Sequence, residues 1–61
     1  MLVVVEFYRE ILIEISADDC GFHWAAFKQN SLLIDSSKQG GFEDEKSALS
    51  HAYQQIDWFL N

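Results

Sequence analysis

The first long stretch of the chain, residues 2–16 (LVVVEFYREILIEIS), constrains the fold more than any other because it contains neither glycine nor proline. Its odd-numbered positions are apolar except for Arg9, and its three glutamates stand at even-numbered positions. A period of two residues is typical of a β-strand with one buried face. We therefore predict one long N-terminal strand, and the way the rest of the chain covers its apolar face decides the fold.

An α-helix is the alternative for the same stretch, because some of its apolar residues also recur at a spacing of three and four. Two physical effects disfavour the helix. Six of the fifteen residues are Val or Ile, which lose side-chain freedom in a helix and pack well on a pleated sheet. In a helix, Glu6, Glu10 and Glu14 would also stack as like charges, each pair unfavourable by about 0.2–0.5 kcal/mol. The strand is the preferred interpretation.

The length of 61 residues predicts a single domain, residues 1–61, that buries only about 60% of its unfolded surface. One cysteine excludes an internal disulfide, and two histidines with one cysteine are too few for a structural zinc site. We expect neither a metal nor a cofactor. Because 49% of the residues are hydrophobic, some apolar surface should remain for a partner.

Ten acidic residues against four basic ones give a formal charge of −6, which repels phosphate backbones and anionic membranes. Nucleic acid and membranes are therefore not expected as partners. The longest wholly apolar run, residues 2–5, is too short to span a bilayer, and the start lacks the pattern of a signal peptide. These features and the free thiol favour a cytoplasmic location.

The remaining chain alternates turn signals with short apolar segments. Residues 17–21 predict a hairpin loop, residues 21–28 an aromatic strand, Gln29-Asn30 a two-residue turn and residues 31–36 a third strand. After a loop, Asp44 is the expected N-cap of an amphipathic helix that continues to Leu60. The predicted fold is α+β, a three-stranded antiparallel meander with one C-terminal helix packed on one face.

This arrangement leaves part of the N-terminal strand without a partner. The second strand is long enough to pair only with residues 10–16, so residues 2–8 should project beyond the hairpin with unpaired backbone groups. Such an edge is a template for strand addition. We predict a homodimer formed through the N-terminal strand, which either pairs with the same segment of a second copy in a continuous sheet or crosses over to cover the core of that copy.

The sheet face opposite the helix is the expected interaction surface, either for self-association or for another protein, because it is too apolar for open water. Trp58 lies at the edge of the polar side of the helix, either as a boundary residue or as part of a contact surface. The residues of this candidate surface, with those of the dimerising strand, are Val3, Val5, Phe7, Tyr8, Leu12, Ala25, Phe27, Leu33 and Trp58.

Asp19, Cys20 and His23 form the one cluster that resembles a nucleophile with its base. A surface thiol beside a strand histidine is the preferred interpretation, because no basic residue or helix N-terminus nearby would stabilise a thiolate. Metal binding by Cys20, His23 and His51 is disfavoured because their spacing shows no paired ligands. We expect no catalytic residue and no enzymatic activity.

The order of features from residue 13 onward resembles the small YegP-like domains. The features are an aromatic strand (Phe22-His23-Trp24), a turn with Asn30, a strand ending at Ser36, and Phe42 before a capped helix carrying Ala48. The resemblance implies a β-β-β-α unit that packs in pairs, and it carries no activity. The chain departs from that pattern by lacking the glycine usually found beside the turn asparagine, and by its acidic N-terminal stretch.

These observations favour a small homodimeric protein-interaction module without catalytic activity. The alternative is an acidic nucleic-acid mimic or regulator that occupies the binding site of a basic DNA-binding protein. Added salt should weaken a complex formed by mimicry strongly and leave an apolar sheet-face interface almost unchanged.

Overall fold

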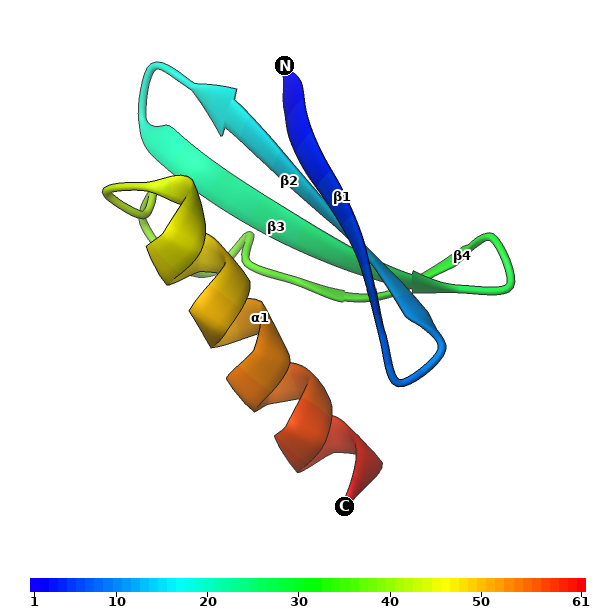
Figure 1. Ribbon diagram of the computed structural model, residues 1–61. Coiled ribbons are helices and arrows are strands. Elements are labelled where there is room, and N and C mark those ends of the chain that lie inside the picture. The colour runs from blue at the N-terminus through cyan, green and yellow to red at the C-terminus, as the bar shows by residue number, and fades with distance from the viewer.

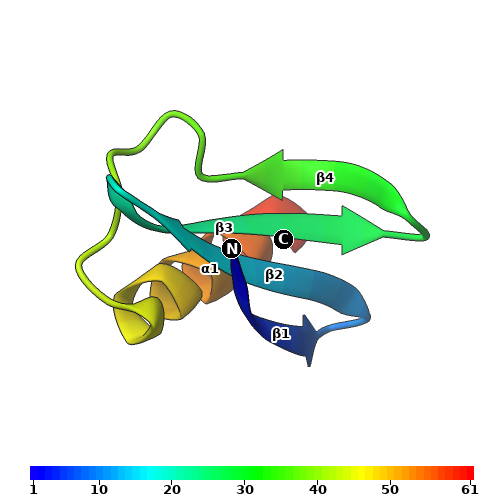
Figure 2. The same cartoon turned by 90° about the horizontal axis from the view of Figure 1, so that it is seen from above.

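The structure is a computed structural model that describes all 61 residues. An antiparallel sheet with the strand order β1-β2-β3-β4 carries a single helix, α1, on one face (Figures 1 and 2). The elements are β1 (Leu2–Tyr8), β2 (Ile11–Asp18), β3 (Gly21–Lys28), β4 (Ser31–Asp35) and α1 (Glu45–Leu60). The α+β class and the C-terminal helix are confirmed, but the sheet has four strands and not three.

The prediction of one continuous N-terminal strand is wrong. Arg9 and Glu10 form a tight turn in which both residues have positive φ, 54° and 66°, and β1 folds back onto β2. Two residues at positive φ match the right-handed twist of the flanking strands. Residues 2–8 therefore do not project unpaired, because β1 pairs with β2 from Leu2 to Tyr8.

A contact with the far end of the chain holds this turn. The Tyr8 hydroxyl and the Arg9 guanidinium both donate to Asp57 Oδ1, at 2.7 and 2.9 Å. The Tyr8 hydrogen bond, and then that of Arg9, lower the pKa of Asp57, while the same bond to Asp57 raises the pKa of Tyr8. The first hairpin is thus tied to the last turn of α1.

The turn also changes which residues are buried. It places Tyr8 directly opposite Ile11, so the side facing α1 is even-numbered from Val4 to Tyr8 in β1 and odd-numbered in β2. Val5 and Phe7 consequently lie on the opposite face from Ile11, although all three share the same period in the sequence.

The core lies between α1 and the inner face of the sheet, and α1 contacts β1, β2 and β3. Asp44 caps the helix as predicted, accepting a hydrogen bond from Ser47 N–H at 2.7 Å. Of the predicted apolar stripe of α1, three residues are fully buried, whereas Phe59 and Leu60 remain exposed. The buried apolar residues are Ile11, Ile13, Ile15, Trp24, Ala26, Ala48, Ala52 and Ile56.

The loop before α1 is fastened to the start of β3. Phe22 and Phe42 exchange two backbone hydrogen bonds, of 2.9 and 2.8 Å. A Cβ atom on Gly41 would lie 1.9 Å from the Cys20 carbonyl oxygen, so only glycine permits this approach. The single helix is neither long nor apolar enough to cross a membrane.

Candidate interaction surface

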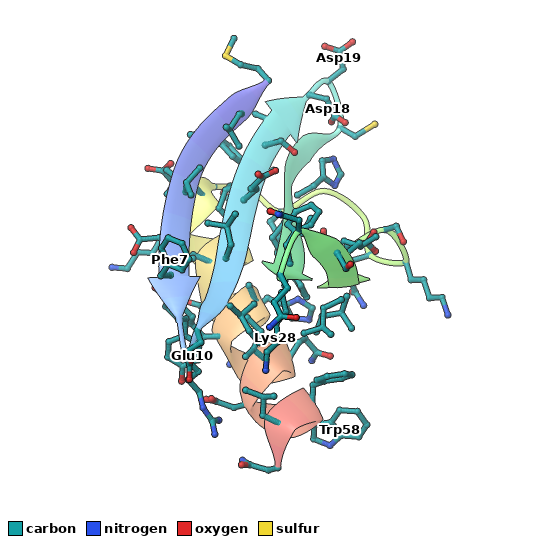
Figure 3. The ribbon with its side chains drawn as sticks, turned by 90° about the vertical axis from the view of Figure 1, so that its right-hand side faces the viewer. Phe7, Glu10, Asp18, Asp19, Lys28 and Trp58 are labelled. Atoms are coloured by element: carbon teal, nitrogen blue, oxygen red, sulfur yellow. The ribbon has the colours of Figure 1, made fainter.

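One apolar residue from each strand forms a continuous row across the sheet face opposite α1. The pairing register places Phe7 opposite Leu12, Leu12 opposite Phe27, and Phe27 opposite Leu32. Phe7 and Leu32, on the two edge strands, are 73% and 56% exposed, and the two central residues are half-buried. We call these four residues the apolar row. Figure 3 views this face, with α1 behind the strands and Phe7 on β1.

Three predicted surface residues, Leu12, Ala25 and Phe27, lie on this open face. Val5 extends the apolar surface along β1 and is 47% exposed. Val3 lies at an irregularity in the pairing between Leu2 and Val4 and is 41% exposed.

Tyr8 and Leu33 were predicted on the open face, and the structure places both against the core on the other side. The ring of Tyr8 packs on Tyr53 with centroids 4.5 Å apart. Leu33 has no partner in the register, because Phe27 pairs with Leu32 and the next pair is Ala26 with Ile34. This bulge turns Leu33 towards the core and leaves Leu32 on the open face.

Trp58 is not part of the open face. It is 79% exposed near the C-terminal end of α1, at a distance from Phe7 in Figure 3. It lines a separate groove of about 360 Å³ between α1 and β4, together with Ile34, His51 and Phe59. The sequence suggested a contact role for Trp58 but did not indicate this groove, which brings the C-terminal half of α1 together with the end of β4 and the loop after it.

A shallow acidic hollow of about 370 Å³ opens on the same face as the apolar row, beyond the end of β4. Ser16, His23 and Ala25 line it together with the exposed carboxylates of Asp18 and Asp35. The backbone N–H of Cys20, and then His23, lower the pKa of Asp18. Hydrogen bonds from Ser37 lower the pKa of Asp35. Both carboxylates are therefore charged at neutral pH.

The predicted cluster around Cys20 has a different arrangement from a catalytic one. His23 Nε2 lies 3.0 Å from Asp18 Oδ1, so the aspartate beside the imidazole is Asp18 and not Asp19. The exposed Cys20 is joined to this pair through its backbone N–H, at 2.8 Å from Asp18, and its thiol makes no hydrogen bond to His23.

His51 lies apart from Cys20 and His23, on α1. Its Nδ1 accepts a hydrogen bond from Trp24 Nε1 at 3.0 Å, so the imidazole satisfies a buried indole. The three side chains weighed as metal ligands do not come together, and no group of three His, Cys, Asp or Glu side chains does so elsewhere.

Comparison of the chain with protein-family models, with curated proteins and with solved structures finds no match. The resemblance to YegP-like domains therefore stays a prediction.

Proposed function

We propose that this protein is a small cytoplasmic protein-interaction module, homodimeric and without catalytic activity, whose working surface is the open face of the sheet. The observation that carries the proposal is the apolar row, which crosses all four strands on a face that α1 does not cover. Burial of one exposed phenylalanine contributes about 1.5–3 kcal/mol to binding. Such a row is typical of the centre of an interface.

The proposed dimer forms through β1. The sequence suggested an unpaired overhang of this segment, whereas in the structure β1 is paired with β2 and exposes only its outer edge. β1 is an edge strand of seven residues in which Glu6 carries the single charge, and it lacks the proline and lysine that usually protect an edge. The other edge strand, β4, has only five residues, and each of the two edge strands has one irregularity in its pairing. The edge of β1 is therefore the better template for a second copy.

An antiparallel two-fold pairing of β1 centred on Val5 avoids opposed charges. Val5 lies opposite its own copy, and Glu6 lies opposite Val4 of the second copy instead of another glutamate. The result is a continuous sheet of both copies in which the open faces remain accessible.

Analytical ultracentrifugation tests the dimer. The unchanged protein should sediment at twice the chain mass of 7.1 kDa at micromolar concentration, and Val5→Lys should give single chains because it opposes two lysines at the two-fold axis. Leu32→Lys, the same change on the other edge strand, should remain dimeric. A single-chain mass for the unchanged protein, or a dimeric Val5→Lys, would contradict the dimer.

A pull-down from native cell extract tests the working surface. Phe27→Asp should lose partners that the unchanged protein retains, because it places a charge in the centre of the apolar row. Trp58→Asp, an equal change at an exposed aromatic residue outside the open face, should retain them. Circular dichroism checks that both variants fold. Equal capture by both variants would contradict the proposal.

The second candidate function, an acidic mimic or regulator of a basic DNA-binding protein, is favoured by the carboxylates around the acidic hollow. Mimicry does not need the apolar row, so Phe27→Asp would leave the complex intact and added salt would disrupt it. The pull-down repeated at two salt concentrations separates the two functions.

A further inference from the structure

We infer that the open face binds a basic amphipathic helix of another protein, with its apolar residues on the apolar row and its Lys or Arg residues over the acidic hollow. This inference rests on the proposed function, since it names the partner of the same surface. It adds the chemistry, the secondary structure and the spacing of apolar and basic residues in the bound segment.

On β2, β3 and β4 the apolar row lies at one end of the open face and the acidic hollow at the other, while β1 stays apolar along its length through Val5 and Leu2. Along β3, Ala25 lies two residues and His23 four residues beyond Phe27, and Ala25 pairs with Asp35 of β4. At about 3.4 Å per residue these positions are about 7 and 13 Å from the row. Figure 3 shows Asp18 at the end of the sheet away from Glu10 and Lys28.

The charges of the open face fit a cationic segment. Glu14 stands in the middle of this face, opposite Val5 on one side and Ala25 on the other. Asp18 is 60% exposed and ionised, and Asp35 is also exposed. Among the paired strand residues, none of those on the open face is an arginine or a lysine, because Lys28, opposite Ser31, alternates with Phe27 and lies on the α1 side. The carboxylates of the open face therefore have no basic neighbour on β2 or β3 of that face.

A second copy of the chain does not fit this face. Two open faces packed together would bring their copies of Glu14, Asp18 and Asp35 into one interface between chains of charge −6. Such desolvated like charges are strongly unfavourable. The proposed β1 dimer leaves the face open, so both interactions are compatible.

A helix suits the face because the same sheet already binds α1 on its other side through small and aliphatic residues. A helix rises about 1.5 Å per residue, so 7 and 13 Å correspond to about five and nine residues. The partner helix should therefore carry apolar residues over one or two turns and basic residues one to two turns further along one face.

The test uses synthetic helical peptides of about 18 residues, long enough to hold a helix. One has leucines at one end of a face and lysines further along it, and the second replaces the lysines with glutamines. Titration into the isotope-labelled full chain is followed by NMR. The lysine peptide should shift the resonances of Leu12, Phe27 and Asp35, and it should bind more tightly than the glutamine peptide.

Charge-neutral variants locate the cationic contact. Asp18→Asn with Asp35→Asn should weaken binding of the lysine peptide about fivefold, as expected for the loss of two exposed ion pairs. Glu43→Gln with Glu45→Gln, the same change of charge at the start of α1, should leave the affinity unchanged.

Three outcomes would overturn the inference. The lysine peptide could shift only residues around Glu43 and Glu45, the glutamine peptide could bind the open face equally tightly, or neither peptide could bind that face. In each case the pull-down with Phe27→Asp still decides whether the open face is a working surface, so the two proposals fail separately.

Discussion

Replacement of Glu10 by glycine should stabilise the protein, because Glu10 holds a left-handed backbone conformation with φ of 66°. A residue with a side chain loses about 1–2 kcal/mol in that conformation. Glycine avoids this penalty. It lowers the free energy of unfolding by about 0.5–1 kcal/mol, however, because an unfolded chain with glycine has more conformational freedom to lose on folding. The expected net gain is about 0.5–1 kcal/mol, which raises the midpoint temperature by about 2–8 °C for a domain of this size.

Thermal unfolding followed by circular dichroism measures this shift, and Glu10→Gln is the matched control. The glutamine variant removes the same charge and keeps the strained backbone. Its free energy of unfolding should therefore stay within about 0.5 kcal/mol of that of the unchanged protein. In a continuous strand over residues 2–16, glycine at position 10 would destabilise by about 0.5–1 kcal/mol. A lowered midpoint for Glu10→Gly would therefore refute the turn and the register built on it.

Gly41→Ala should destabilise by about 1–3 kcal/mol in urea unfolding, because its Cβ would push the loop off Cys20 and break the two backbone hydrogen bonds between Phe22 and Phe42. Gly40→Ala, whose Cβ would meet no atom within 4 Å, should change stability by less than about 0.5 kcal/mol. Stability should also fall in acid, because four carboxyl groups have folded-state pKa values below the ordinary 3.8. The stabilisation by the ionised carboxylates is present above pH 3.8 and is lost as the pH falls through their lower folded-state pKa values. A urea midpoint that stays constant from about pH 5 to pH 2.5 would contradict this prediction. The four groups are Asp18, Asp35, Asp44 and Asp57.

The elements that could be predicted from the sequence are those with local signals. Asn30 tolerates positive φ, and the turn at Gln29–Asn30 forms with φ of 52° and 66°. Asp44 precedes an apolar stripe of helical period, and it caps α1. The core residues of β2 and β3 follow from their period of two. In each case the sequence signal lies within a few residues of the turn, helix start or strand that it predicts.

The turn at Arg9–Glu10 has no such local signal. Neither residue favours positive φ, and the side chains of the turn donate hydrogen bonds to Asp57, which is 48 residues further along the chain from Arg9. The tertiary contact overrides the local preference. Together with the pairing of β1 with β2 and the packing of Tyr8 on Tyr53, this contact accompanies a hairpin in place of one strand, and the hairpin reverses the faces expected for Val5, Phe7 and Tyr8.

Part of the interaction surface could be predicted from the sequence, because it depends on a turn with a local signal. The two-residue turn at Gln29–Asn30 places Lys28 opposite Ser31 and thus Phe27 opposite Leu32, so Leu32 could have been assigned to the open face from the register alone. The bulge that turns Leu33 inward carries no sequence signal. The acidic hollow brings together Asp18 and Asp35 from different hairpins, so it requires the whole meander before it is visible.

The exposed apolar surface follows from the number of elements in the chain. A four-stranded sheet has two faces, and one helix of 16 residues covers the inner face of β1, β2 and β3. Only nine of the 61 residues are buried, which is a small core for a chain without a disulfide. A second copy at β1 would remove the flat edge, and a partner helix on the open face would supply the layer that the chain lacks. Binding should therefore raise the midpoint of thermal unfolding as well as bury the apolar row, because a ligand that binds only the folded state stabilises it.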